Sequence, residues 1–110
     1  MPNAKIYVDQ TAWSQKDDII GLLPQLRDLL CRELSVGPVA CQLAVLPVHG
    51  PRDQPQVNVE LHILPTADRT RELLSSLAVA IRLLMASVVA GHIAVRIAQL
   101  DPHTYVALKS

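Results

Sequence analysis

The residue best suited to chemistry is a proline at position 2. A small residue such as Pro2 permits removal of the initiator Met1, which leaves the ring nitrogen as a free secondary amine. A chain-terminal amine has an ordinary pKa of about 7.7–8.0, and burial or a nearby cation lowers that pKa toward the neutral range in which a general base works best. The sequence therefore offers one candidate proton acceptor at its very start.

Other chemical signatures are weak. The four glycines are isolated, so neither a dinucleotide-binding motif nor a P-loop is present. No metal site is expected, because the histidines stand singly, without HxxxH or CxxC spacing, at His49, His62, His92 and His103. Cys31 and Cys41 fall in an expected helix and an expected strand. Both are predicted to be core thiols, and a disulfide between them is left open.

Length and composition restrict the class of protein. The 110 residues predict a single domain, 1–110, whose core is aliphatic, because the chain has one Trp, two Tyr and no Phe. Ten basic and ten acidic residues cancel, which argues against nucleic acid or an anionic membrane as a partner. The most apolar stretch, 73–95, carries Arg82 near its middle, whereas a membrane-spanning helix needs about 20 apolar residues. Without a signal-peptide pattern, we expect a cytoplasmic protein.

The first half of the chain predicts a strand, a helix and a second strand. Residues 4–9 alternate between apolar and polar side chains, as in a half-buried strand. Leucines and isoleucines then recur at helical spacing over 15–35, with Ser14 as the expected N-cap. Pro24 should kink this helix or delay its start, and Gly37-Pro38 should end it.

The second half repeats this order. The expected elements are a strand at 39–48, a loop at 49–55, a strand at 57–63, a helix at 69–90 that Gly91 stops, and a strand at 93–97. The resulting β-α-β-β-α-β order predicts an α+β fold, a four-stranded sheet with two helices on one face. Nothing in the chain is left to cover the other face, which bears Lys5, Glu60 and His62, so association through that face is expected.

Three stretches resemble one known family. They are the opening 1–8, with its proline before a strand, the strand and turn at 57–70, with Arg69 entering the second helix, and the closing strand at 95–102. On these residues the chain resembles the tautomerase superfamily and, within it, 5-carboxymethyl-2-hydroxymuconate isomerase. The β-α-β-β-α-β order agrees with that family over nearly the whole chain.

The resemblance implies an assembly and an activity. It implies a homotrimer in which three sheets surround a central channel. It also implies that Pro2 transfers a proton between carbon and oxygen of a small unsaturated 2-hydroxy or 2-oxo acid, an enol-to-ketone isomerisation without a cofactor. Arg69 would hold the substrate carboxylate, since a guanidinium donates two parallel hydrogen bonds.

The chain departs from the family pattern in two places. Gln42 stands where the family has an arginine, and an amide can hydrogen-bond an oxygen but cannot neutralise a second carboxylate. The loop 48–56 is shorter and lacks aromatic residues; its Arg52 either replaces the missing cation or is a solvated loop charge. In the tail, His103 and Tyr105 either line a pocket between subunits or lie on the surface.

A second class of function fits the same element order. A catalytically inactive tautomerase-type or ferredoxin-like module could bind a small ligand or a protein without turnover. Removal of Met1 and a trimeric assembly with a free prolyl amine would favour the enzyme over this module.

Overall fold

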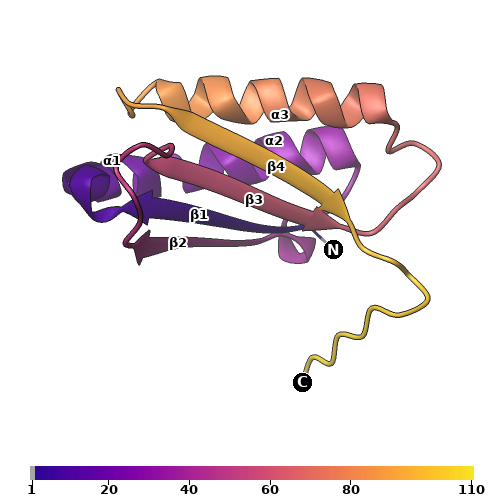
Figure 1. Ribbon diagram of the computed structural model, residues 1–110. Coiled ribbons are helices and arrows are strands. Elements are labelled where there is room, and N and C mark those ends of the chain that lie inside the picture. Colours follow the sequence, from indigo (N-terminus) through magenta and orange to yellow (C-terminus); the bar gives the residue numbers. More distant parts are fainter. Residues whose placement is uncertain (1) are drawn as a thin grey trace.

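The computed structural model describes residues 2–110, which form a layer of strands beneath a layer of helices (Figure 1). The strands are β1 (Asn3–Asp9), β2 (Gln42–Val48), β3 (Val57–Ile63) and β4 (Ile93–Gln99). The helices are α1 (Lys16–Gly21), α2 (Leu23–Leu34) and α3 (Arg71–Ala86), with short 3-10 helices η1 (Gln10–Gln15) and η2 (Pro38–Ala40). The predicted α+β fold, with two long helices on one face of a four-stranded sheet, is confirmed.

The strand order is β2-β1-β3-β4. β1 pairs with β2 in parallel and β3 with β4 in parallel, while the two central strands β1 and β3 run antiparallel. In a ferredoxin-like chain another strand splits each β-α-β unit. Here each unit keeps its two strands side by side, so the ferredoxin-like alternative does not describe this sheet. The antiparallel central pair also brings the start of β1 beside the end of β3.

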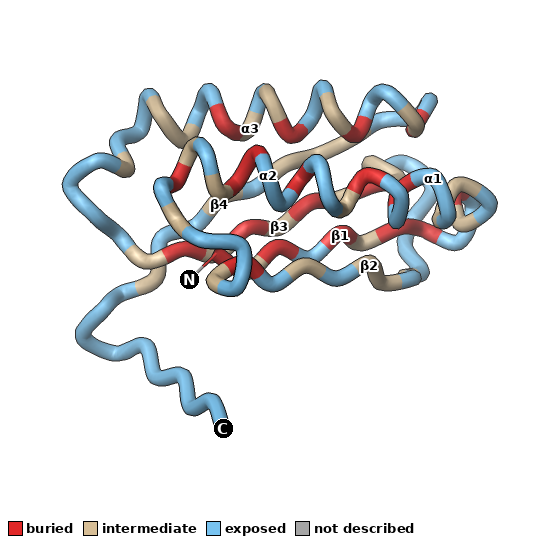
Figure 2. The backbone as a smooth tube through the Cα atoms, turned by 180° about the vertical axis from the view of Figure 1, so that it is seen from behind, coloured by how far each residue is buried: buried red, intermediate tan, exposed pale blue. Residues whose placement is uncertain are grey.

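The core lies between the sheet and the helices (Figure 2). Every second residue of β1 and β3 is buried, as the predicted alternation requires. The side chains that are less than 2 % exposed are almost all aliphatic and come from both halves of the chain, namely Ile6, Val8, Ile19, Leu26, Leu30, Val57, Val59, Leu61, Ile63, Leu77, Ile81 and Met85. One shared core therefore holds both halves.

The helix predicted at 15–35 is broken into three pieces. Residues 10–15 form η1, and the α-helix that follows stops at Gly21 before α2 begins at Leu23. Pro24 lies in the first turn of α2, where its missing N–H costs no helical hydrogen bond. The predicted effect of Pro24 is thus confirmed, but Ser14 as N-cap is wrong. Asp9 caps η1 instead, through a hydrogen bond from the Thr11 amide.

The ends of several elements also differ from prediction, and α3 begins at Arg71, so Arg69 precedes this helix rather than entering it. α2 ends at Leu34 because Ser35 adopts a left-handed conformation, with φ of 55°, before Gly37 is reached. β2 starts at Gln42 rather than at residue 39, since η2 occupies the preceding residues. α3 ends at Ala86 and not at residue 90; beyond it the Ser87 and Val88 amides bond the carbonyls three residues back, of Leu84 and Met85, as in a tightened last turn.

The second face of the sheet is bare of helices (Figure 1). A row of charges crosses it, since Glu60 on β3 pairs in register with Lys5 on β1 and with Arg96 on β4. The Arg96 guanidinium donates to the Asn58 side chain at 3.0 Å, and His62 Nε2 lies 3.5 Å from Glu60 Oε1. Lys5, Glu60 and His62 lie on this face, as predicted, and Asn58 and Arg96 lie beside them. Within residues 2–110, no helix is long and apolar enough to cross a membrane.

Candidate functional site

The predicted site residues gather at one end of the sheet, where β1 begins. Pro2 is buried immediately before β1, and its carbonyl accepts a 3.0 Å hydrogen bond from the Gln42 amide. Because β3 runs antiparallel to β1, the end of β3 lies at the same place, with Asn3 opposite His62. The turn that follows β3 brings Arg69 to this end of the sheet. The structure thus assembles three residues that lie far apart in the sequence.

The backbone of Gln42 is hydrogen-bonded within the sheet, and its side chain is exposed to solvent. It is the first residue of β2 and pairs in register with Asn3. Its exposed side chain lines a groove of about 500 Å³ together with Pro24 and Arg27 of α2 and with Cys41. An amide here can donate to or accept from a ligand oxygen, but the cation that borders this groove is Arg27.

Arg69 binds the protein's own backbone. Its Nη1 donates to the Leu64 carbonyl at 2.5 Å, and its Nη2 donates to the Leu34 carbonyl at 3.3 Å. Leu34 is the last residue of α2, so the guanidinium sits at the negative end of that helix dipole. Nε is buried without a partner among the described residues. A guanidinium carries five N–H groups, and two of them make these bonds, so Arg69 retains donors for a ligand.

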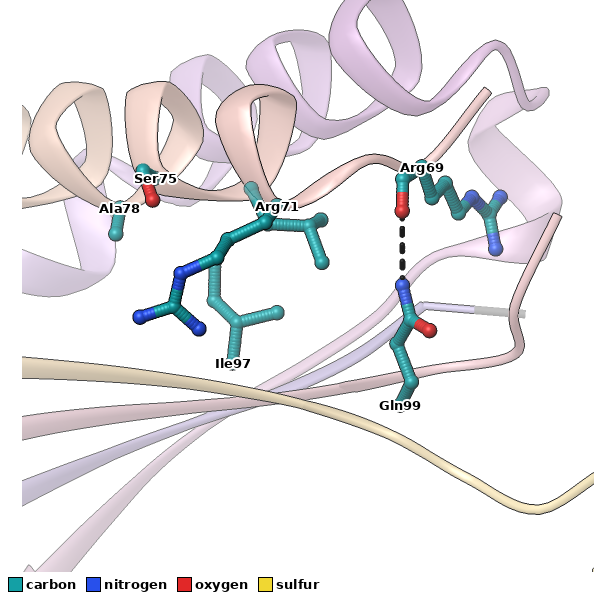
Figure 3. Close-up of a pocket in the computed structure, with 7 residues that line it drawn as sticks. Arg69, Arg71, Ser75, Ala78, Ile97 and Gln99 are labelled. Atoms are coloured by element: carbon teal, nitrogen blue, oxygen red, sulfur yellow. Dashed lines mark hydrogen bonds between the residues drawn. The ribbon is translucent and has the colours of Figure 1, made fainter. Parts of the chain in front are cut away.

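An open groove of about 400 Å³ runs between α3 and β4 beside Arg69 (Figure 3). It is lined by Arg69, Arg71, Leu74, Ser75, Ala78, Ile97 and Gln99. The Gln99 side chain donates to the Arg69 carbonyl at 3.0 Å, across the groove. Figure 3 shows the guanidinium groups of Arg69 and Arg71 pointing in opposite directions, with that of Arg71 extending toward β4.

Three polar residues that line this groove were not predicted from the sequence, namely Arg71, Ser75 and Gln99. One signal for Gln99 was available. The helix-facing positions of β4 follow the alternation of Ile93, Val95 and Ile97, and Gln99 is the polar residue that continues it. Arg71 and Ser75 carry no comparable signal, because polar residues in the first turns of an exposed helix are ordinary.

Among residues 2–110, the pKa values of two groups are shifted. Hydrogen bonds from the Thr11 hydroxyl, at 2.7 Å, and from the Thr11 amide lower the pKa of the Asp9 carboxyl. Burial raises the pKa of the Cys41 thiol to about 11, and the neighbouring Cys31 thiol adds to that rise. Both cysteines are free, with Cys41 buried and Cys31 half-buried against the core, as predicted for core thiols. Asp9 lies at the far end of β1 from Pro2, whereas Cys41 adjoins Gln42.

Arg52 and the tail lie away from Pro2. Arg52 is exposed and lines a hollow with Asp9 and Thr11, at the far end of the seven-residue strand β1. At about 3.3 Å per residue, β1 separates Arg52 from the Pro2 of its own chain by about 20 Å. His103 and Tyr105 belong to an exposed tail that extends from the body of the molecule (Figure 1). Within residues 2–110, no group of three His, Cys, Asp or Glu side chains is placed to hold a metal ion.

Comparisons with known proteins bear on the fold. No protein-family model matches the chain, and no curated protein is similar to it in sequence. Solved structures do match. The W0 fused 4-OT wild type symmetric trimer superposes with a TM-score of 0.74 at 12% identity, over 96% of this chain and 93% of that chain. The macrophage migration inhibitory factor-like protein of Entamoeba histolytica superposes with a TM-score of 0.68 at 11% identity, over 99% of this chain and 96% of that chain. The chain has a tautomerase-type fold.

A third solved structure extends this result. N1, a member of the cis-3-chloroacrylic acid dehalogenase family, matches with a TM-score of 0.70 at 14% identity, over 96% of this chain and 79% of that chain. At such identities the likeness shows the tautomerase-type fold and no residue's role. The narrower resemblance to 5-carboxymethyl-2-hydroxymuconate isomerase stays a prediction from the sequence. Met1, whose removal would free the Pro2 nitrogen, lies outside the described residues.

Proposed function

We propose that this protein is a cofactor-independent tautomerase in which Pro2, once Met1 is removed, is the general base. One observation carries the proposal: a buried proline stands at the head of a central strand in a tautomerase-type fold. A chain-terminal α-amino group has an ordinary pKa of about 7.7–8.0. Burial disfavours its charged form and lowers that pKa, which suits proton transfer near neutral pH.

The proposed reaction converts an enol into a ketone. The neutral Pro2 nitrogen takes the proton of the 2-hydroxyl group, and the O–H electron pair becomes the second bond of the new carbonyl. The electrons of the carbon–carbon double bond then take a proton back from the prolinium, at carbon. The base is regenerated, and no electron carrier or metal is needed for the atoms and charges to balance. The proposed substrate is a small unsaturated 2-hydroxy acid.

Arg69 and Gln42 are the proposed binding groups for the substrate's oxygens. Arg69 already uses one N–H on each terminal nitrogen to bind the Leu64 and Leu34 carbonyls. These bonds fix the guanidinium plane, so its remaining N–H donors are preorganised for a carboxylate. Gln42 offers a neutral amide on the other side of Pro2. One cation and one neutral amide on opposite sides of Pro2 favour a substrate with one carboxylate and a second, uncharged oxygen.

The proposed functional unit is a homotrimer. The bare sheet face and two exposed aliphatic side chains of the tail support association: Val106 and Leu108 are 87% and 96% exposed. One structural neighbour, the W0 fused 4-OT protein, is described as a symmetric trimer. By analogy, three copies of this chain would cover the faces that a single copy leaves bare.

The experiment compares Pro2→Ala with Gln56→Ala. Gln56 precedes β3 as Pro2 precedes β1, and its backbone carbonyl likewise accepts a bond, from the Asp9 amide at 2.8 Å. Intact mass spectrometry first establishes that Met1 is absent. Loss of enol absorbance is then followed with phenylenolpyruvate and with a 2-hydroxydienoate. Protein that retains Met1 has an amide at the Pro2 nitrogen and should turn over about 10²–10⁴-fold more slowly, as for loss of a general base, while Gln56→Ala should not. Pro2→Ala still ends in an amine, now primary and no longer fixed by a ring, so its turnover should fall by less. Full activity of protein that retains Met1 would refute the proposal.

A binding module without turnover is the second candidate. The observation that favours it is the engagement of Arg69 with two backbone carbonyls, which is also what a purely structural arginine would do. Such a module would bind a small carboxylic acid in the groove beside Arg71 and leave an enol substrate unchanged even when Met1 is removed. Calorimetric titration with the same acids, next to the absorbance assay, separates the two candidates.

A further inference from the structure

Two thiols from different elements meet beside the proposed site. Cys31 lies in the last turn of α2, and Cys41 is the residue immediately before β2. Their sulfur atoms are 3.8 Å apart, in van der Waals contact, although the residues are ten positions apart in the chain. A disulfide needs an S–S distance of about 2.05 Å. Forming the bond therefore requires a change of side-chain rotamer at one or both cysteines, by rotation about the Cα–Cβ bond.

A small reagent can reach this pair. Cys41, although only 8% exposed, lines the groove formed with Pro24, Arg27 and Gln42. Cys31 is half-buried at the edge of the core, so a reagent that enters this groove meets Cys41 on one side and can reach Cys31 beside it. Arg27 is one helical turn before Cys31 on α2, and its positive charge acts on Cys41 to favour the thiolate. This cation opposes the burial that otherwise keeps Cys41 protonated.

We propose that Cys31 and Cys41 form a reversible disulfide, by reaction with a peroxide or with a low-molecular-weight disulfide such as oxidised glutathione. This site is independent of the proposed function. The bond would tie the last turn of α2 to the start of β2, across the turn that contains the left-handed Ser35. Gln42, whose amide binds the Pro2 carbonyl, is the next residue.

The peroxide reaction proceeds in two balanced steps. The half-buried Cys31 thiolate attacks one peroxide oxygen, the O–O bond breaks, hydroxide leaves, and the sulfur is oxidised to a sulfenic acid. The Cys41 sulfur, having lost its proton to solvent, then attacks the Cys31 sulfur. The S–S bond forms as the S–O bond breaks, and a second hydroxide leaves. Overall, two thiols and one hydrogen peroxide give one disulfide and two waters. A thiol such as dithiothreitol reverses the change by exchange.

The test counts thiols in the folded, full-length protein. Protein treated with hydrogen peroxide or oxidised glutathione is alkylated with iodoacetamide, and its intact mass is measured by mass spectrometry. A second portion is digested with trypsin, and the peptide masses are measured. The treated chain should be two hydrogens lighter and accept no alkyl group, whereas the reduced chain accepts two. The disulfide should join the tryptic peptides 28–32 and 33–52, and dithiothreitol should restore both thiols.

Single variants supply the controls. Cys31→Ser and Cys41→Ser each keep one sulfur, so neither can form the internal bond, and each should show a free thiol or a lasting mixed disulfide. The proposal fails if both wild-type thiols still alkylate after treatment. It fails equally if the wild type stops at a mixed disulfide, if the disulfide joins two chains, or if the internal bond forms only in urea-unfolded protein.

Discussion

The two β-α-β units of this chain share one layout and differ in how they connect their strands. In the second unit, a single 16-residue helix, α3, leads from β3 to β4. In the first unit, η1, α1 and α2 divide the same path between β1 and β2, with a break just before Pro24. Because both units pack on one core, the layout is set by sheet pairing rather than by the regularity of the connecting helix.

The units differ more in chemistry than in shape. Pro2 and Gln56 occupy corresponding positions before the first strand of each unit. The backbone carbonyl of each accepts a hydrogen bond from a neighbouring strand. Gln56 has only an amide nitrogen there, whereas Pro2 offers a secondary amine once Met1 is removed. The cysteine pair also belongs to the first unit. The second unit contributes Arg69, which reaches back to the last carbonyl of α2. The functional asymmetry therefore rests on a few residues within a repeated framework.

The largest effect on stability is expected from the shared core. Leu26 on α2 and Ile81 on α3 are both about fully buried, at 0% and 1% exposed. Replacing either with Ala should cost about 2–5 kcal/mol in the free energy of unfolding, from lost burial and the cavity left behind. Urea denaturation followed by circular dichroism should show one transition for both variants. Two separate transitions in either variant would contradict a core common to the two units.

An intermediate effect is expected where Arg69 joins the units. Arg69→Ala removes charge-assisted bonds to the Leu64 and Leu34 carbonyls, which should cost about 1.5–3 kcal/mol in the free energy of unfolding. Arg71→Ala is the matched control: this arginine is exposed, and its loss should change stability by less than about 0.5 kcal/mol. Equal losses in the two variants would mean that Arg69 does not link the second unit to α2.

The smallest of these effects concerns the start of the helices. The Thr70 hydroxyl accepts from the Leu73 amide at 3.2 Å and caps α3, so Thr70→Ala should cost about 1 kcal/mol. Ser14 lies within η1 and is exposed, and Ser14→Ala should fall within about 0.5 kcal/mol of the wild type. Thermal denaturation of the two variants compares the caps directly. If Ser14→Ala lost more stability than Thr70→Ala, Ser14 rather than Asp9 would be the capping residue.

Much of the secondary structure follows from local patterns. The alternation at 57–63 predicted β3 with both ends correct, because alternate side chains of a strand face opposite sides and only one side is buried here. The break near Pro24 was also predictable, since proline lacks the N–H that a helix interior requires. The ends of helices were less predictable. α2 ends where Ser35 adopts a left-handed backbone conformation, and no pattern of side chains in the sequence predicts that conformation.

The amino-acid sequence by itself determined the element order, the aliphatic core and the proline before the first strand. Each depends on residue type and on spacing along the chain. The tertiary structure decided the strand order, the bonds from Arg69 to carbonyls five and 35 positions away, and the contact between Cys31 and Cys41. These features come from segments that meet only when sheet pairing and core packing bring them together. Local periodicity reports which side of an element is buried, and it carries no information about which distant element will cover that side.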